Sequence, residues 1–430
     1  MKILVVGQGG REHTLVWKIA QSPLVEQIYC LPGNPGIAEL ATCPSVSFSS
    51  DTSDFSQLAE FAQREGIDLT VIGPEEPLAN GIVDVFESYG LPIFGPNKRA
   101  AIIEASKDFA KGLMSKYNIP TATYQTFEQA DEAIAYVEDL AQPVFVKADG
   151  LAAGKGAIPG ITTLDAIKAI QRVLVDRDFG AAGQKVVIEE LMEGEEASFT
   201  ILTDGSNVVT LPTSQDHKRA LDNDQGQNTG GMGAYSPAPV ITPELHQLVM
   251  ESIVRPTIDG MKVEGRPYKG VLYIGLMITP QGPKVVEYNC RFGDPKAQVL
   301  LPRIKSDLIA AFMACINGTL AQVEIELSSE AAVCVVMASG GYPQRYQTGR
   351  QIVGLERLPP TGKTTVFHAG TATSQNGDLI TNGGRVLGVS ALGYDIQTAV
   401  EHAYRGVSNI NFDQAHYRTD IAHRAIERVK

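Results

Sequence analysis

The first hundred residues alternate strand and helix patterns, and this alternation limits the folds that the chain can adopt. Apolar strand patterns at 3–6, 27–30, 69–72 and 91–94 are interleaved with helical patterns at 12–21 and 55–64. Strands joined through helices become parallel neighbours in one sheet. We therefore expect an α/β fold that begins with a doubly wound parallel-sheet domain over residues 1–102. Because the chain has 430 residues, further domains should follow.

The turn after the first strand reads GQGGREH over residues 7–13. A dinucleotide-binding turn would need a third glycine where Glu12 stands, and an acid at the end of the second strand, where Asn34 stands. These two residues disfavour a dinucleotide-dependent oxidoreductase. A glycine turn that opens a helix still favours an anion, and the neighbouring Arg11 and His13 favour phosphate. Packing alone could also explain the glycines.

A second glycine-rich stretch, VKADGLAAGKG over residues 146–156, joins a strand with one lysine to a loop with another. Loop residues without a Cβ let phosphate oxygens approach backbone N–H groups, and the two lysines could neutralise phosphate charge. The commoner nucleotide loop has a longer spacing and a Ser or Thr after its lysine, which this stretch lacks. Any metal ligands must then come from elsewhere in the chain. An ordinary strand-to-loop turn is the alternative interpretation.

A compact strand and helix unit of lid size follows from residue 121 to residue 191. It contains a strand at 185–190 and a helix that opens at Thr162, with Asp165 in the capping-box position. A helical pattern over 97–118 precedes this unit, and Lys107 lies off its apolar stripe. A lysine in such a place is ordinarily solvated.

Three patterns describe the second half of the chain. Asp204-Gly205, between two strand patterns, predicts a hairpin. Residues 214–239 are polar and glycine-rich, and we interpret them as a long binding loop. After about residue 326, short strands with Asn-Gly turns predict a more antiparallel closing domain.

The strand pattern at 284–289 carries hard oxygen donors. Strand periodicity places Glu287, Asn289 and Arg291 on one face, and Val286 and Tyr288 on the other. Carboxylate and amide oxygens suit Mg²⁺, which also takes water and phosphate oxygens. A hydrogen bond at the rim of the sheet is the alternative. Together with the glycine-rich stretch, the pair favours a metal-assisted phosphate site.

Composition excludes several classes of protein. A net charge of −13 argues against a general nucleic-acid surface. The five cysteines are scattered and odd in number, which is typical of free thiols that pack in a reducing compartment. The start MKILVVGQGG does not resemble a signal peptide, and no apolar run reaches membrane-spanning length. We expect a cytoplasmic protein with no membrane partner.

Six motifs in order along the chain carry a resemblance to a known family: GQGGREH, PGNPG, GPEEPL, SQDHKR, NTGGMGAYSP and EYNCRFGDP. The chain resembles the phosphoribosylamine–glycine ligase family of the ATP-grasp superfamily. The resemblance implies an ATP-grasp fold with a small α+β lid and a C-terminal, mainly antiparallel β domain. The implied boundaries are 1–102 for the N-terminal domain, 103–121 with 191–326 for the central domain, 122–190 for the lid and 327–430 for the C-terminal domain.

The resemblance also implies an activity and a nucleotide site. The enzyme would use ATP and Mg²⁺ or Mn²⁺ to join glycine to 5-phosphoribosylamine through glycyl phosphate, and a monomer is the starting expectation. The lid would close over the reaction and exclude water. Residues expected to contact ATP are Lys107, Lys147, Gly150, Gly154, Lys155 and Gly156 at the phosphates, Glu189, Glu190 and Leu191 at the adenine, and Glu196 at the ribose. Glu287 and Asn289 would hold the metal.

The resemblance places the phosphoribosylamine site at the N-terminal glycine turn, the end of the second strand and the central loop. Residues expected to bind substrate are Gly9, Gly10, Arg11, Pro32, Gly33, Asn34, Asp216, Lys218 and Arg291. We assign catalytic roles to Lys147, Arg291, Asp216 and Asp294, of which the last three would recognise amine and carboxylate groups.

Two positions depart from the family pattern. Where the family commonly reads GDPETQ, this chain reads GDPKAQ, so that Lys296 replaces an acid and Ala297 replaces a hydroxyl. Gln227 stands where a proline is usual. A surface helix that starts at Lys296 would make that change harmless. Two alternatives stay open here: another ATP-grasp carboxylate–amine ligase, and a nucleotide-binding regulator that has lost catalysis.

Overall fold

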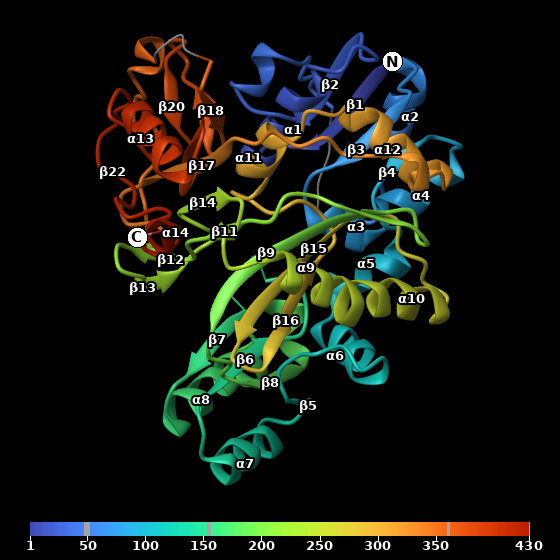
Figure 1. The fold of residues 1–430 in the computed structure, drawn as a ribbon, viewed down its shortest axis with the longest axis vertical. Helices are drawn as coiled ribbons and strands as arrows, with labels where there is room; N and C mark the ends of the chain where they lie inside the picture. The colour runs from blue at the N-terminus through green and yellow to red at the C-terminus, as the bar shows by residue number, and fades with distance from the viewer. Residues whose placement is uncertain (47–51, 153–155, 359–361, 430) are drawn as a thin grey trace.

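The computed structural model describes residues 1–46, 52–152, 156–358 and 362–429. Figure 1 shows four parts: an N-terminal domain at upper right, a C-terminal domain at upper left, a central sheet below them and a small lid at the bottom. The central sheet connects the lid to the two upper domains. In the described part of the chain, no helix is long and apolar enough to cross a membrane. All five cysteines are free, as expected.

The N-terminal domain is a parallel sheet with strand order β2-β1-β3-β4, which confirms the expected doubly wound architecture. On one face of β1, Leu4 and Val6 pack in a core with α2 and α4. On the other face, Ile3 and Val5 pack with α1 and with the later helix α12 (Leu308–Asn317). Its elements are β1 (Lys2–Gly7), α1 (Gly10–Ile19), β2 (Gln27–Pro32), η1 (Ile37–Glu39), α2 (Ser56–Glu65), β3 (Leu69–Ile72), α3 (Glu75–Asn80), α4 (Ile82–Ser88) and β4 (Ile93–Phe94).

The helical pattern over 97–118 forms two helices, α5 (Lys98–Ala105) and α6 (Lys107–Lys116), rather than one. Ser106 lies between them in an extended conformation, and its hydroxyl accepts a hydrogen bond from Phe109 N. Serine favours such N-cap positions because its side chain replaces a missing backbone partner. The break makes Lys107 the first residue of α6, so that this lysine is not a member of a continuous solvated face.

The lid is an antiparallel sheet with strand order β5-β8-β6-β7, covered by α7 and α8. The predicted helix start is confirmed, because Thr162 and Asp165 form a capping box at α8. The lid contains β5 (Tyr124–Phe127), α7 (Ala130–Leu140), β6 (Val144–Ala148), β7 (Ala157–Gly160), α8 (Thr163–Ile170), η2 (Gln171–Val175), η3 (Gly180–Gln184) and β8 (Val186–Glu190).

The central sheet has strand order β10-β9-β15-β16, and all its neighbours are antiparallel. The hairpin predicted at Asp204-Gly205 is confirmed as the β9–β10 connection. The elements of this part are β9 (Glu195–Thr203), β10 (Val208–Thr210), α9 (Pro243–Val249), η4 (Met250–Val254), α10 (Arg255–Val263), β15 (Gly270–Thr279), β16 (Gly282–Asn289), α11 (Ala297–Leu300), η5 (Leu301–Arg303), α12 (Leu308–Asn317) and η6 (Leu320–Gln322).

The segment 214–239 is not the long loop that its composition predicted. It contains four short strands, β11 (Gln215–Asp216), β12 (Arg219–Leu221), β13 (Gln225–Asn228) and β14 (Gly233–Ser236). β12 and β13 pair with each other, whereas β11 and β14 extend the sheet of the C-terminal domain. The pairing partner of β14 is β17, about a hundred residues away, which local composition could not reveal.

The C-terminal domain is antiparallel, as expected, with strand order β11-β14-β17-β21-β18 and helix α13 packed against β17 and β21. The Asn376-Gly377 turn connects β19 to β20, which confirms one of the Asn-Gly signals. The elements are β17 (Ala331–Ser339), η7 (Leu355–Arg357), β18 (Thr364–His368), β19 (Thr371–Thr373), β20 (Leu379–Thr381), β21 (Arg385–Gly393), α13 (Ile396–Val407), β22 (Ala415–His416) and α14 (His423–Val429).

Candidate functional site

Strand β16 carries the two candidate metal ligands. The pairing of β16 with β15 shifts register at Gly275 and Leu276, which face Glu287 and Val285, so that Val286 is an extra residue. Val285 is therefore a core residue, whereas Val286 is only half-buried. A bulge re-aims the residues beyond it, because it interrupts the alternation of the strand.

The positive charges of four lysines act on the carboxyl group of Glu287. Burial alone would raise the pKa of its carboxyl group, but the charges of Lys218, Lys147, Lys107 and Lys296 lower it below the usual value. Glu287 is therefore ionised in a cationic surrounding. These lysines come from the central segment, β6, the start of α6 and the residue before α11, which lie far apart in the sequence.

Asn289 supplies a second oxygen donor and is buried. Among the residues that the structure describes, its Nδ2 atom has no hydrogen-bond partner. A buried amide without a partner is costly, so water or a ligand is expected there. No group of three or more His, Cys, Asp or Glu side chains that could hold a metal occurs within the described ranges. A two-residue oxygen site fits Mg²⁺, which keeps waters and takes phosphate oxygens as its other ligands.

The start of α6 is tied to the glycine-rich loop of the lid. Lys107 Nζ donates a hydrogen bond to Gly150 O at 2.9 Å. Asp149 accepts hydrogen bonds from the Ser106 hydroxyl and from Asp108 N, each at 3.1 Å. The helix break therefore positions both Lys107 and the loop. The apolar pattern of 97–118 did not predict this contact between α6 and the loop.

Glycine at position 150 is required by close packing. A Cβ atom there would lie 2.5 Å from Cβ of Ala182, and the residue has a φ of +155°. A side chain would push the loop away from η3, because Cβ atoms do not approach so closely. Two of the predicted ATP contacts, Gly154 and Lys155, lie outside the described residues. Gly156 is buried and packs near Ala152 and Ala148.

Glu189 lies between two lysines in the lid–core junction. Its Oε2 atom is 2.9 Å from Lys147 Nζ and 3.0 Å from Lys111 Nζ. Lys111 is buried, and burial lowers its pKa to about 8 despite the charge of Glu189. Sequence reasoning missed Lys111, although its position four residues after Lys107 places both lysines on one face of α6.

The other residues expected near the nucleoside are also paired. Glu190 is half-exposed, and its carboxylate is 2.9 Å from Lys284 Nζ. Glu196 Oε2 is 2.6 Å from Lys218 Nζ. Leu191 follows β8 and is half-buried. The main chain of this segment is also paired, because Glu190 N donates to Thr123 O at 3.0 Å and Leu191 N donates to Pro143 O at 3.4 Å.

The N-terminal glycine turn is organised by Glu12. Its carboxylate accepts a hydrogen bond from Gly9 N at 2.6 Å and binds Arg11 Nε at 2.6 Å. A Cβ atom at Gly7 or Gly73 would lie within 2.5 Å of the Glu12 side chain. Glu12 thus fills the space between two strand ends, and a carboxylate there opposes the pyrophosphate of a dinucleotide.

Arg11 and Arg291 meet two glutamates in the interior. Arg11 is buried and also donates to Phe292 O at 3.2 Å. Arg291 binds Glu75 Oε2 at 2.9 Å and Glu104 Oε1 at 3.0 Å. Glu75 is 3.7 Å from Arg11 as well. The structure therefore brings Arg291 to the N-terminal domain, whereas the charge partners of Glu287 are lysines.

A cavity of about 280 Å³ lies between the N-terminal and C-terminal domains. Three predicted substrate or catalytic residues line it: Gly9, Asn34 and Asp294. Seven other residues complete its lining: Gln8, Tyr342, Ala369, Gly370, Thr371, Asn382 and Arg385. Six of these come from the C-terminal domain, where our sequence analysis had assigned no site residue.

Asn34 joins the two walls of this cavity. Its Nδ2 atom donates to Gln8 O at 2.7 Å and to His368 O at 2.9 Å, and Oδ1 accepts from Ile37 N at 2.9 Å. Gly33 beside it has a φ of +73° and lies against Cys43, whereas Pro32 is exposed. Gly10 faces the Gln298 side chain.

Asp216 and Lys296 form a buried ion pair, with Oδ2 and Nζ 2.6 Å apart. Only 7% of the Lys296 side chain and 5% of the Asp216 side chain are exposed. Lys296 does stand at the start of a short helix, α11, but the surface position that would make it harmless is not observed. The lysine at position 296, where the family pattern has an acid, therefore changes the charge of a buried part of the candidate site.

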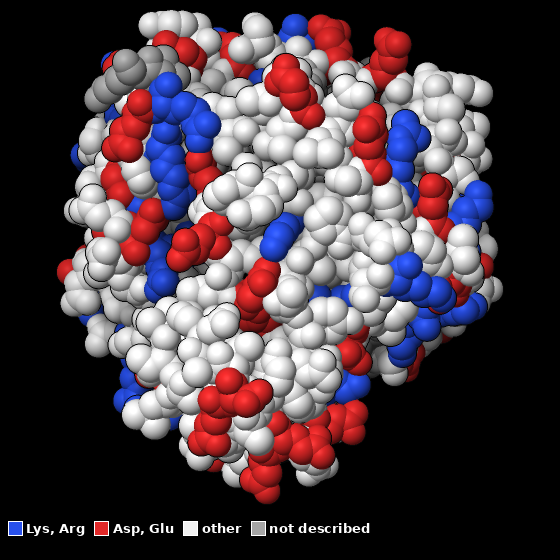
Figure 2. Space-filling view, turned by 60° about the horizontal axis from the view of Figure 1, so that its bottom comes forward, with Lys and Arg blue, Asp and Glu red and all other residues white. Residues whose placement is uncertain are grey.

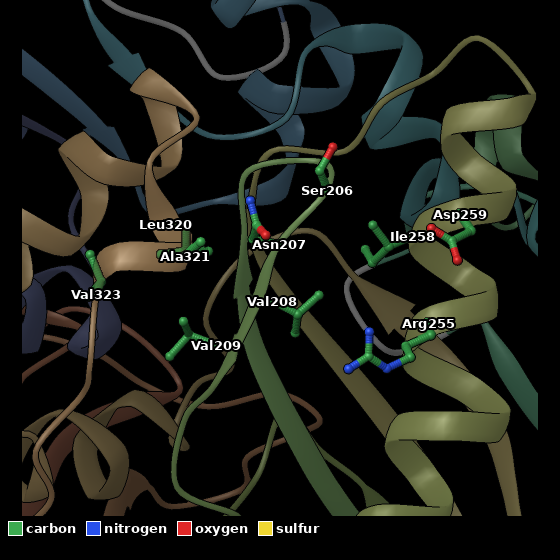
Figure 3. A pocket seen from close by; sticks show the side chains of 10 residues that line it. All are labelled: Ser206, Asn207, Val208, Val209, Arg255, Ile258, Asp259, Leu320, Ala321 and Val323. Atoms are coloured by element: carbon green, nitrogen blue, oxygen red, sulfur yellow. The ribbon is translucent and has the colours of Figure 1, made fainter.

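Another cavity, of about 290 Å³, lies between the β9–β10 hairpin, α10 and η6 (Figure 3). The figure shows Arg255 and Asp259 on α10 facing Val208 and Asn207 on the hairpin side. Its lining includes none of the residues expected to bind ATP, metal or substrate. The candidate site is therefore the lysine cluster around Glu287 together with the interdomain cavity.

The charged side chains in Figure 2 do not form a broad basic face. Lysines and arginines alternate with acids over much of this view, and acids gather at the lower end. A nucleic-acid surface would need clustered basic residues on one face. In the view of Figure 2, basic side chains gather only in a small group at the right, and elsewhere acids lie near them.

Three models of the phosphoribosylglycinamide synthetase family match the chain: its N domain over residues 1–104, its ATP-grasp (A) domain over 105–297 and its C domain over 332–424. The chain belongs to this family. The ranges cover most of the chain, and the finer boundaries expected at 121/122, 190/191 and 326/327 stay our proposal.

Relatives over the full length agree with this membership. Phosphoribosylamine–glycine ligase of Neisseria meningitidis serogroup A is 51% identical over 100% of both chains. The ligase of Escherichia coli O6:H1 is 50% identical over 100% of this chain and 99% of its own. The expectation of an ATP-grasp enzyme that forms a carbon–nitrogen bond is confirmed.

Solved structures confirm the expected fold. The crystal structure of phosphoribosylamine–glycine ligase from Thermotoga maritima matches with a TM-score of 0.83, at 31% identity, over 98% of this chain and 100% of that one. A biotin carboxylase–ATP complex from Campylobacter jejuni matches with a TM-score of 0.73 at 14% identity, over 97% and 92%, and supports the fold alone. Use of ATP and a divalent metal follows from membership in this ATP-grasp family.

Proposed function

We propose that this chain joins glycine to 5-phosphoribosylamine, with conversion of ATP to ADP and phosphate, and that glycinamide ribonucleotide is the product. The observation that carries the proposal is that the charges of four lysines act on Glu287, in a chain that also has an interdomain cavity lined by Gly9, Asn34 and Asp294. The full-length relatives named above support the choice of substrates. The reaction is a step of purine biosynthesis.

Lys107 and Lys147 would bind the ATP phosphates, and the loop 150–156 would cover them. Both lysines act on the charge of Glu287, and Lys107 already touches the loop at Gly150. Such positively charged groups stabilise the charge that spreads over a transferring phosphoryl group. The main chain of 189–191 would border the adenine, and Glu196 would bind the ribose.

Glu287 and Asn289 would hold a divalent metal, and we propose Mg²⁺ or Mn²⁺. Glu287 is ionised by its lysine surroundings, and the partnerless amide of Asn289 lies beside it on the same strand. When bound, such an ion adds positive charge to the phosphate oxygens. The two residues are hard oxygen donors and need the phosphates to complete the coordination.

The interdomain cavity would hold phosphoribosylamine. Gly9 and Asn34 line one wall, and Thr371 and Arg385 line the other. The Arg385 guanidinium already donates to Asp294 O at 3.0 Å and to Gly230 O at 2.9 Å, so it is held at the cavity wall. A guanidinium suits the phosphate of the ribose, and the Asp294 carboxylate suits the amine.

The chemistry needs no protein nucleophile. A carboxylate oxygen of glycine attacks the γ-phosphorus of ATP, the bond to ADP breaks, and glycyl phosphate forms. The amine of phosphoribosylamine then attacks the carbonyl carbon and displaces phosphate. The residues supply positioning and charge stabilisation, and closure of the lid over the site would protect the acyl phosphate from water.

The proposal predicts ADP release that requires glycine, phosphoribosylamine and Mg²⁺ together. A coupled ADP assay with each component omitted in turn tests it. Glu287→Ala should abolish turnover with an unchanged circular dichroism spectrum, because it removes a metal ligand, whereas the surface variant Glu251→Ala should keep full activity. A protein that binds ATP but releases no ADP in the complete mixture would be a regulator and would refute the proposal. The cytoplasmic location and the monomeric state stay predictions.

A further inference from the structure

Lys296 lies where two elements from distant parts of the chain meet. Its ammonium binds Asp216 on β11 and lies 5.1 Å from the centre of the Tyr273 ring on β15. A Cβ atom at Gly293 would lie 2.5 Å from Cδ of Lys296, so the absence of a side chain at 293 makes room for the lysine stem. The lysine is thus accommodated by its surroundings in a defined place.

The Lys296 ammonium has unused hydrogen-bonding capacity. A lysine ammonium carries three N–H donors. Among the residues that the structure describes, Lys296 donates one hydrogen bond, to Asp216 at 2.6 Å. Buried donors are almost always satisfied by protein, water or a ligand. Two N–H groups of a nearly buried cation are therefore available to an acceptor that comes from outside the chain.

The position of Lys296 indicates which acceptor this is. Its ammonium lies over the ring of Tyr273, and Tyr273 pairs in the sheet with Asn289, a proposed metal ligand. Lys296 also follows Asp294, which lines the interdomain cavity, by two residues. Lys296 is therefore close to both the proposed phosphate site and the proposed phosphoribosylamine site. In the reaction sequence above, the group that must lie between these two is the carboxylate of glycine. An anionic carboxylate matches a buried cation with free donors.

We propose that Lys296 is a catalytic residue that binds the carboxylate of glycine, and that Asp216 is a positioning residue that holds the lysine in place. This inference rests on the proposed function. Lys296 donates hydrogen bonds to the carboxylate and keeps its proton while the glycine oxygen attacks the γ-phosphorus and ADP leaves. The family pattern GDPETQ has an acid at this position, so the lysine changes the charge of the side chain there from −1 to +1.

Lys296→Met tests the proposal, because methionine fills similar space without the charge. We expect the KM for glycine to rise by about 10- to 100-fold, the range for loss of one charged hydrogen bond. The KM for ATP should stay within about twofold. Asp216→Asn should raise the KM for glycine less, since it leaves the ammonium in place. Lys305→Met is the matched control, because Lys305 pairs with Glu326 on the surface. Calorimetric titration of each variant with glycine in the presence of MgADP gives a readout that is independent of turnover.

The outcomes separate this inference from the proposed function. A wild-type protein without glycine-dependent ADP release would refute the function itself. An active wild type, together with a Lys296→Met variant whose glycine KM and glycine affinity are unchanged, would overturn the role of Lys296 and leave the function intact. If the single variant does not fold, the double variant Lys296→Met/Asp216→Asn removes both buried charges, and its glycine KM is compared with that of Asp216→Asn alone.

Discussion

The ion pairs of two adjacent glutamates in the lid differ in burial, and this difference gives a sharp prediction. Glu189 has one carboxylate oxygen within 3.0 Å of both Lys147 and Lys111, and only 3% of its side chain is exposed. Glu190 pairs with Lys284 at 2.9 Å, and 36% of its side chain is exposed. Glu189→Gln and Glu190→Gln therefore make the same chemical change, the first at a buried ion pair and the second at a half-exposed one.

The expected loss for Glu189→Gln follows from the charges that remain. Removal of one partner from a buried ion pair costs about 3–5 kcal/mol. Lys111 can limit its share by release of its proton. Its pKa is about 8 with Glu189 ionised and falls further without that charge, so deprotonation at pH 7 costs at most about 1.4 kcal/mol in the variant. We therefore expect a loss of about 3 kcal/mol, at the lower end of this range. For Glu190→Gln we expect less than about 1 kcal/mol, as for other solvent-exposed pairs.

Native-state hydrogen exchange of peptides that cover β6 and β8 measures the stability of the lid itself. The only tryptophan, Trp17, lies in α1 of the N-terminal domain, so its fluorescence would not report on the lid. MgATP should recover more lid stability in Glu189→Gln than in wild type, because phosphate would replace the lost anion beside Lys147. Equal losses in the two variants would refute the view that Glu189 is the counter-charge of the two lysines.

Two further predictions concern stability elsewhere in the chain. Burial lowers the pKa of His13 to about 3 and of His368 to about 4, so the unfolded chain binds more protons below pH 6.5 and stability falls as the pH falls from there. In urea denaturation between pH 6 and pH 4.5, the free energy of unfolding of His13→Gln should fall by about 1.4 kcal/mol less per pH unit than that of wild type. An equal pH dependence in the two proteins would contradict a buried neutral histidine. Arg418 has no exposed surface and binds Asp224 and Asp420, so Arg418→Met should lower the free energy of unfolding by about 3 kcal/mol. Arg405 is exposed, so Arg405→Met should change the free energy of unfolding by less than about 0.5 kcal/mol. A similarly small change for Arg418→Met would show that the ion pairs of Arg418 do not stabilise the fold.

Local signals in the sequence were sufficient for much of the fold. The capping box at Thr162 and the hairpin at Asp204-Gly205 were predicted and are present, because each depends on hydrogen bonds between residues a few positions apart. The alternation of strands and helices likewise gave the parallel sheet, and the motif order gave the family. The segment 214–239 was predicted less well, since its strands β11 and β14 depend on a partner sheet formed much later in the chain.

By itself, the sequence determined the fold class and the family, and it supplied the candidate residues for the proposed phosphate and metal sites, because these depend on local patterns and on motifs in a fixed order. Only the tertiary structure showed that Lys111 shares Glu189 with Lys147, that the C-terminal domain forms a wall of the interdomain cavity, and that Lys296 is buried against Asp216. The physical reason is that the charge of a buried group is set by neighbours that arrive from other elements. The sequence does not distinguish an exposed lysine at a helix start from a lysine that is buried in an ion pair, because only the packing of other elements sets the difference.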